Sequence, residues 1–174
     1  MSEALFNNDV IVFCDKVVQE YIKKSDNLMQ QDRLTVGSQK IYSGAIPEWQ
    51  ENNHWQWITF ERQIDVVVGL KVTLNGVAKT IPLIAIELKS GTWLNTDELD
   101  KKSAIYGSLK ELYPWIHTVF IMKSNKDRGI TQKVILRNGR QFNTIYTDWD
   151  EQTQKLLTTL ISQQLEYLIE YWQL

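Results

Sequence analysis

The stretch Ile64-Asp65-Val66-Val67-Val68 is followed, across an Asn75-Gly76 pair, by Ile84-Ala85-Ile86-Glu87-Leu88-Lys89. Both stretches are rich in β-branched residues and predict strands, one over residues 57–74 and the other over residues 80–88. An Asn-Gly pair between two such runs is the strongest short-range signal of a β-hairpin. We therefore expect an antiparallel strand pair at the centre of the fold.

The apolar pattern of these two strands selects their register. A three-residue loop at Asn75-Gly76-Val77 gathers the apolar residues on one face and places Asp65 directly opposite Glu87. A two-residue turn instead pairs Asp65 with Ile86 and mismatches the two faces. Because proline has no N–H to donate, Pro82 then requires a non-bonded ladder position, a bulge or a sheet edge.

The triplet Glu87-Leu88-Lys89 ends an apolar strand, so Glu87 and Lys89 share one face. Two adjacent carboxylates repel each other, and a divalent cation such as Mg²⁺ relieves that repulsion through oxygen ligands while keeping several waters. Lys89 could orient or deprotonate a water, or stabilise charge on a phosphate. The alternative is structural: an ion pair of Lys89 with Asp65 or Glu87 at a strand exit, without catalysis.

These residues resemble the motif of the PD-(D/E)xK nuclease superfamily, which has the restriction-endonuclease-like fold. The motif lies within residues 64–91, and the order of elements resembles the family over most of the chain. The resemblance implies that Asp65 and Glu87 bind Mg²⁺, with Mn²⁺ as a substitute ion, and that the Leu88 carbonyl is a third ligand. It also implies that Lys89 is the catalytic lysine. Ile64 stands where the superfamily has a proline before the first acid.

Members of this superfamily also use side chains from the neighbouring helices. For an acid on the first helix the candidate is Glu20, with Asp15 as the alternative; an ordinary exposed helix charge is the structural explanation for either. For a polar residue on the helix after the motif the candidate is Lys102, with Lys101 as the alternative.

The rest of the chain predicts an α/β fold, an α+β sandwich of helices around one mixed sheet, in a single domain over residues 1–174. Hydrophobic spacing, capping residues and turn residues predict the elements in order. These are a helix from Asp9 to about Gln31, an irregular segment 32–53 with one short strand, a helix from Thr96 to Tyr113, a strand from Trp115 to Met122, a second hairpin of residues 134–136 and 142–146 about Asn138-Gly139, and a helix from Asp148 to Trp172.

Composition excludes several classes of protein. The 174 residues are 43% hydrophobic and 23% charged, which is the balance of a globular domain. No apolar run approaches the ~18 residues of a membrane span, and the N-terminus has no signal-peptide pattern. A single cysteine, Cys14, excludes an intramolecular disulfide, and two histidines, His54 and His117, leave little room for a histidine metal site. We therefore expect a cytoplasmic protein without a membrane segment.

Charge is segregated along the chain although the net charge is only -2. Residues 123–140 hold six basic residues against one acid, which indicates either phosphate contacts or a solvated hairpin. The candidates for DNA contact are Lys123, Lys126, Arg128 and Lys133. Four tryptophans near the motif could stack on bases, although packing in the core or in a dimer interface is the commoner role: Trp49, Trp55, Trp57 and Trp93.

The sequence thus predicts a metal-dependent endonuclease that hydrolyses phosphodiester bonds in DNA, with a dimer supplying one active site per strand. The alternative is a non-catalytic DNA-binding or assembly module that keeps the nuclease fold. The nuclease interpretation requires the Asp65 and Glu87 carboxylates within about 6 Å of each other and Lys89 on the same side of the sheet.

Overall fold

The computed structural model describes residues 3–25, 33–51, 54–74, 76–90, 96–124 and 132–172. Within these ranges the strands form one five-stranded sheet in the order β1-β2-β3-β4-β5. β1, β2 and β3 are antiparallel neighbours, whereas β3, β4 and β5 run parallel. The elements are, in chain order, α1 (Glu3–Lys24), β1 (Leu34–Trp49), β2 (Trp55–Leu74), β3 (Val77–Lys89), α2 (Thr96–Leu112), β4 (His117–Met122), α3 (Gln132–Asn138), β5 (Thr144–Tyr146) and α4 (Glu151–Trp172).

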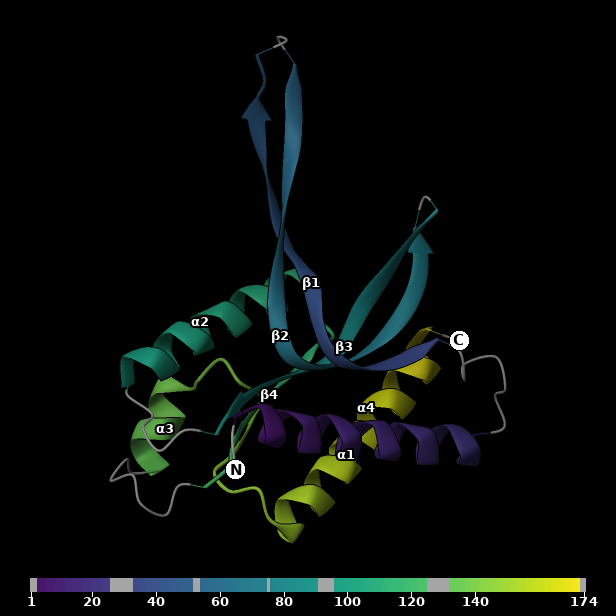
Figure 1. The fold of residues 1–174 in the computed structure, drawn as a ribbon, viewed down its shortest axis with the longest axis vertical. Coiled ribbons are helices and arrows are strands. Elements are labelled where there is room, and N and C mark those ends of the chain that lie inside the picture. Colours follow the sequence, from purple (N-terminus) through teal and green to yellow (C-terminus); the bar gives the residue numbers. More distant parts are fainter. Residues whose placement is uncertain are drawn as a thin grey trace.

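Helices cover both faces of the sheet (Figure 1). α1 and α4 pack on one face, where they meet Val66 and Val68 of β2. α2 and α3 pack on the other face, where they meet Val67. α1 reaches the sheet with residues at three- and four-residue spacing, as an amphipathic helix does: Phe6, Val10, Cys14 and Val17. This mixed α/β sheet between helices confirms the predicted fold class.

The central hairpin reaches the predicted register near the motif by a different route. Leu74 pairs with Val77, so the turn has two residues rather than three, and that part of the prediction is wrong. A register shift between Val68 and Gly69 then adds one residue to β3, and Val66 pairs with Ile86 as the apolar pattern predicts. A β-bulge therefore restores the register that the turn alone would lose.

The prediction of an irregular segment before the hairpin is wrong. β1 runs unbroken from Leu34 to Trp49 and pairs with β2 along its whole length. Its Gly44 lies at a register shift with φ +142°, a value that favours glycine. β1 is the edge strand of the sheet. Pro47 is tolerated there because no further strand would accept a hydrogen bond from the backbone N–H that proline lacks. Glycine and proline here mark a bulge and an edge rather than a break.

The second predicted hairpin is also wrong, because the residues before Asn138-Gly139 form the helix α3. The Gly139 N–H donates to the Ile135 carbonyl (2.8 Å), and the buried Asn138 amide donates to Asp100 of α2 (2.9 Å). A Cβ on Gly139 would lie 2.9 Å from the Ile135 carbonyl oxygen, a backbone atom, so glycine suits this helix end. Tertiary packing therefore overrides the β-branched composition of this segment.

The other helices agree with their sequence signals to within a few residues. α1 begins at Glu3 instead of Asp9 and ends at Lys24, while the predicted end at Gln31 lies outside the described residues. α4 begins after Asp150, whose carboxylate caps it by accepting from the Thr153 N–H at 2.8 Å. We find no helix in the described ranges that is long and apolar enough to cross a bilayer.

Candidate active site

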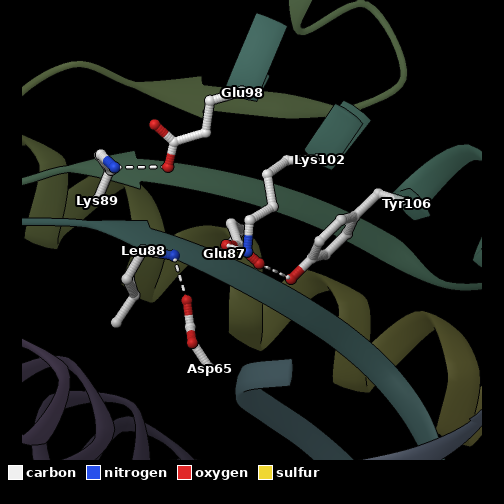
Figure 2. Close-up of polar contacts among 7 residues, drawn as sticks. All are labelled: Asp65, Glu87, Leu88, Lys89, Glu98, Lys102 and Tyr106. Atoms are coloured by element: carbon white, nitrogen blue, oxygen red, sulfur yellow. Dashed lines mark hydrogen bonds and ion pairs between the residues drawn. The ribbon is translucent and has the colours of Figure 1, made fainter. Parts of the chain in front are cut away.

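The candidate site lies where β2 separates from β3. The pairing of β2 with β3 begins at Val66, and a register shift against β1 leaves Asp65 and Val66 opposite one residue, Ser38. Asp65 is therefore at a β-bulge, which re-aims its side chain. The Asp65 carboxylate accepts a hydrogen bond of 2.9 Å from the Leu88 N–H (Figure 2). At the end of the β2–β3 ladder, the Leu88 N–H therefore donates to the Asp65 side chain instead of to a backbone carbonyl of β2.

Glu87 is the most deeply placed acid of the site, with only 6% of its surface exposed. The Tyr106 hydroxyl of α2 donates to Glu87 Oε2 at 3.0 Å, and the Lys102 ammonium forms an ion pair with Glu87 Oε1. An ionised carboxylate this far from water needs such partners, because burial without them is costly. Lys102 and Tyr106 therefore favour the ionised form of Glu87, against the effect of burial, and hold its carboxylate in one orientation.

Lys89 lies one alternation further along β3, and its Nζ forms an ion pair of 2.5 Å with Glu98 of α2. Lys89 and Glu87 both contact α2, so they lie on the same side of the sheet, as strand alternation predicts. Figure 2 shows α2 presenting Glu98, Lys102 and Tyr106 in a row above the strand end. The four-residue spacing of these three places them on one face of the helix.

Burial and like charge act together on the two acids. Desolvation raises the pKa of Asp65, and the nearby charge of Glu3 raises it further, against the lowering effects of the Leu88 N–H and Lys102. Desolvation also raises the pKa of Glu87, with a second contribution from the charge of Asp65. Both carboxyl groups therefore hold a proton more tightly than in water. Such paired, perturbed acids are typical of functional sites.

The acid of the first helix that lies near Asp65 is Glu3, not the predicted Glu20. Glu3 lies near enough to Asp65 for its charge to raise the pKa of Asp65. Glu20 is 17 residues further along α1, about 25 Å at helical rise, and borders a cavity of about 450 Å³ between α1 and α4. The alternative, Asp15, is exposed on the same helix. The structure therefore does not bring Glu20 to the other site residues.

The predicted Lys102 is at the site, and the alternative Lys101 is exposed beside it. Sequence reasoning missed Glu98 and Tyr106, although their spacing from Lys102 on a helix is a signal that could have found them. It also missed Glu3, for which the sequence carries no local signal. A hollow of about 370 Å³ next to the site is bordered by Asp97, Glu98, Lys101, Lys102 and Ile105.

The oxygen atoms at the strand end fit a small divalent cation. Asp65 and Glu87 supply carboxylates, and the Leu88 carbonyl faces the same way as its N–H, toward Asp65, as it does in an extended strand. The positive charge of the Lys102 ammonium favours the ionised forms of both Asp65 and Glu87, so the two acids already have one positively charged side chain beside them. Among the described residues no three His, Cys, Asp or Glu side chains are grouped as a metal site. A cation here would depend on two carboxylates, a carbonyl and water, as Mg²⁺ does.

The candidate DNA contacts are only partly within the described residues. Lys123 follows β4, and its N–H donates to the Lys89 carbonyl at 2.9 Å, which places it next to the end of β3. Lys133 is exposed on α3. Lys126 and Arg128 lie outside the described residues, as does Trp93. Trp49, Trp55 and Trp57 lie on the β1–β2 pair and not in the core.

The mixed α/β sheet between helices is similar to the fold of a solved restriction endonuclease. The chain is similar to a chain of the native BbvCI A2B2 tetramer, a restriction endonuclease, with a TM-score of 0.51 and 12% identity. The similarity covers 87% of this chain, and this chain spans 64% of the length of that one. No family model matches the sequence, and no curated protein matches it. The likeness therefore concerns the fold.

Proposed function

We propose that this protein is a metal-dependent endonuclease that hydrolyses phosphodiester bonds in DNA. The observation that carries the proposal is the meeting of Asp65, Glu87 and Lys89 at one strand end, with both acids at raised pKa. Packing alone does not explain a half-buried Asp65 beside a buried Glu87, because two neighbouring acids cost folding free energy that neutral residues would not. The similarity to BbvCI, a restriction endonuclease, supports the same class of activity.

In this proposal Asp65, Glu87 and the Leu88 carbonyl hold a divalent cation, Mg²⁺ or Mn²⁺. When bound, such an ion polarises a phosphate oxygen and lowers the pKa of a coordinated water. Glu3 lies behind Asp65 and adds negative charge to the same environment.

The side chains of this protein supply the remaining steps. Lys89 holds the attacking water in line with the phosphorus and favours its deprotonated form through the positive charge on Nζ. Glu98 holds the Lys89 ammonium at the strand end through their ion pair. With Glu87 holding a cation, Lys102 would be available to contact a phosphate oxygen, and the Tyr106 hydroxyl would keep the carboxylate in place.

Cleavage of DNA tests the proposal directly. Purified protein is incubated with supercoiled plasmid, linear duplex and branched DNA, each with Mg²⁺, with Mn²⁺ and with EDTA. We expect nicked or linear products with either metal and intact DNA with EDTA. If no DNA form is cut with either metal, the proposal is wrong.

The contacts at the site also favour a second candidate, a DNA-binding or assembly module without catalysis. Glu87 already has Lys102 and Tyr106 as partners, and Lys89 has Glu98, so these two charges have structural partners within the chain. This candidate predicts that the protein binds DNA with unchanged affinity in EDTA and leaves it uncut in both metals. Electrophoretic mobility shift run on the cleavage samples distinguishes the two functions.

A further inference from the structure

The β1–β2 pair extends beyond the rest of the sheet as a two-stranded arm (Figure 1). We define the arm as residues 44–49 of β1 and 55–60 of β2, which pair with each other through Trp49 and Trp55 at its outer end. The pairing of β2 with β3 covers Val66 to Leu74 and does not reach the arm. A two-stranded hairpin without a packed face is only marginally stable in water. The arm therefore has a physical need for a surface to pack on.

One face of the arm is apolar and uncharged. Residues that pair across two antiparallel strands lie on the same face, and successive pairs along the strands lie on opposite faces in turn. The pairs on this face are Ala45 with Thr59, Pro47 with Trp57 and Trp49 with Trp55, and we call these six residues the tryptophan face. Its tryptophans are 53%, 64% and 67% exposed at Trp49, Trp55 and Trp57. Large aromatic side chains exposed together mark an interaction site.

The opposite face of the arm differs. Its pairs are Gly44 with Phe60, Ile46 with Ile58 and Glu48 with Gln56, so it carries a charge and an amide near the outer end. Ile46 and Phe60 are exposed there as well and adjoin Ile58, so this face carries a smaller aliphatic and phenylalanine patch with no tryptophan, bordered by Glu48 and Gln56 toward the outer end. The tryptophan face is thus the more complete apolar surface of the two.

The size of the tryptophan face suits a small two-fold interface. A buried aromatic side chain covers about 150–250 Å², so three tryptophans at these exposures present about 400 Å² per chain. With Pro47 and Thr59 added, two such faces in contact bury roughly 1,000 Å², which is where specific interfaces begin. Tryptophan is also the residue most enriched among those that dominate binding energy.

The charge of the arm favours protein over nucleic acid. The strands carry Lys40 and Arg62 as basic residues near the base of the arm, and Glu48, Glu51 and Glu61 as acids. Surfaces that bind DNA are strongly positive, whereas this one is slightly negative. An isologous contact brings the same patch of two chains together. Because the tryptophan face is uncharged, such a contact brings no like charges together.

We propose that the tryptophan face docks a second copy of this chain, so that two arms pack face to face about a two-fold axis. The proposal does not rest on nuclease activity, since association takes place without DNA or metal. It assigns the exposed tryptophans to self-association and leaves the candidate active site of each chain uncovered, because Asp65 lies further along β2, beyond the arm, where β2 meets β3.

Sedimentation equilibrium of the full chain tests the proposal over about 1–100 µM. We expect a dimer for the wild type and at least a tenfold weaker dimer for the double variant W55S/W57S. The matched control is Tyr171→Ser, which removes an exposed aromatic side chain from α4 and should dimerise as the wild type does. Thermal melts check that each variant is folded. A wild type that is monomeric throughout this range, or a double variant as dimeric as the wild type, overturns the proposal.

Cross-linking tests which face is in contact. The native Cys14 is buried and its thiol pKa is raised to about 12 by burial and by the charge of Asp15, so an introduced cysteine is the reactive one. Thr59→Cys lies on the tryptophan face and Gln56→Cys lies on the opposite face of the same strand. A short bis-maleimide should link T59C into dimers and leave Q56C as monomers. The reverse result overturns the proposal.

A DNA-binding measurement tests the alternative that the tryptophan face binds nucleic acid. If W55S/W57S remains dimeric but binds a labelled duplex at least tenfold more weakly than the wild type, the tryptophans contact nucleic acid and the proposal is wrong. If W55S/W57S is monomeric in the absence of DNA, the tryptophans act in self-association and the proposal is supported.

Discussion

The inner half of β2, residues 64–70, lies between β1 and β3, whereas the outer half, residues 55–63, pairs with β1 beyond the reach of β3. The inner half is buried on both faces and yet contains a carboxylate, Asp65, among its valines. The outer half is open to water and yet exposes Trp55 and Trp57. Each half contains the residue type that its environment disfavours.

This contrast indicates where selection for function acted on the strand. A buried acid and an exposed tryptophan both cost stability or solubility, and a sequence chosen for folding alone would exchange them. Asp65, the acid in the inner half, lies near Glu87 and Lys89, and we propose that it is there for catalysis. The outer departure faces solvent, and we assign it to association. Experiments that treat the two halves separately can break or sharpen this division.

The largest effect is expected from removing the charge of the inner half. Asp65→Asn keeps the size of the side chain and an acceptor for the Leu88 N–H, but removes one of two protein carboxylates. Loss of several kcal/mol of electrostatic stabilisation lowers metal-dependent plasmid cleavage by at least about a thousandfold.

The control for Asp65→Asn is Glu61→Gln, in the outer half of the same strand. Glu61 is about half exposed and 4.0 Å from Lys79, a pair of little energetic weight. We expect wild-type cleavage from Glu61→Gln. Equal losses in both variants would show that charge anywhere on β2 matters, and the division into two halves would fail.

A smaller loss is expected at β3. Lys89→Ala should lower the cleavage rate at saturating DNA by at least about a hundredfold, the usual effect of a group that positions a proton-transfer step. Lys79→Ala, on the exposed part of the same strand, should cleave as the wild type does. Single-turnover plasmid assays with Mg²⁺ compare the two, and a Lys89→Ala enzyme at the wild-type rate would leave the binding-module candidate in place.

Unfolding experiments separate the halves by packing. Val67→Ala removes buried methyl groups between two helical layers and should cost about 2 kcal/mol of unfolding free energy. Trp57→Ala removes a far larger side chain, but from solvent, and should change the unfolding free energy by less than about 0.5 kcal/mol. Urea titration of dilute protein, below the concentration at which it associates, is the measurement. A larger cost for Trp57→Ala would place that tryptophan in the core of the folded chain.

The smallest effect concerns pH. Because burial and Glu3 raise the pKa of Asp65 in the folded state, the folded protein favours the protonated form. The resulting stability is complete below the ordinary carboxyl pKa and is lost as pH rises through the raised value. Asp65→Asn escapes that loss, so metal-free Asp65→Asn should gain up to about 1 kcal/mol over the wild type at pH 7 and almost nothing near pH 3.5.

Thermal melts of both proteins in EDTA between pH 3.5 and pH 8 measure this difference. A divalent cation bound at Asp65 should reverse the order at neutral pH, since it stabilises the wild type through the folded state alone. A stability difference that is constant with pH would mean that the charge of Asp65 is not the cause.

Local chemistry was enough to predict the strand pair that carries the candidate site residues. The β-branched runs predict β2 and β3, and their apolar alternation predicts that Val66 pairs with Ile86. That pairing brings Asp65 and Glu87 to the same end of the hairpin. Pro114 correctly predicts the end of α2, because proline restricts the residue before it and cannot continue a helix. These features depend on residues near one another in the chain or on a pattern of period two.

Features that depend on distant partners were not predictable in this way. Glu3 reaches Asp65 only because α1 crosses under the sheet, and Glu98 reaches Lys89 only because α2 lies over the end of β3. The bulge that aims Asp65 exists because β1 and β2 differ by one residue at Ser38. None of these contacts leaves a pattern within either segment taken by itself.

The sequence by itself determined the strand pair, the meeting of the acids and the lysine beside them, because side-chain alternation and turn chemistry act over a few residues. Only the tertiary structure decided that residues 34–49 form an edge strand, that residues 132–138 form a helix, and that three tryptophans face water. The physical reason is that local propensities amount to about 1 kcal/mol or less per residue. Burial against a distant helix, or its absence on an arm that extends beyond the sheet, outweighs them.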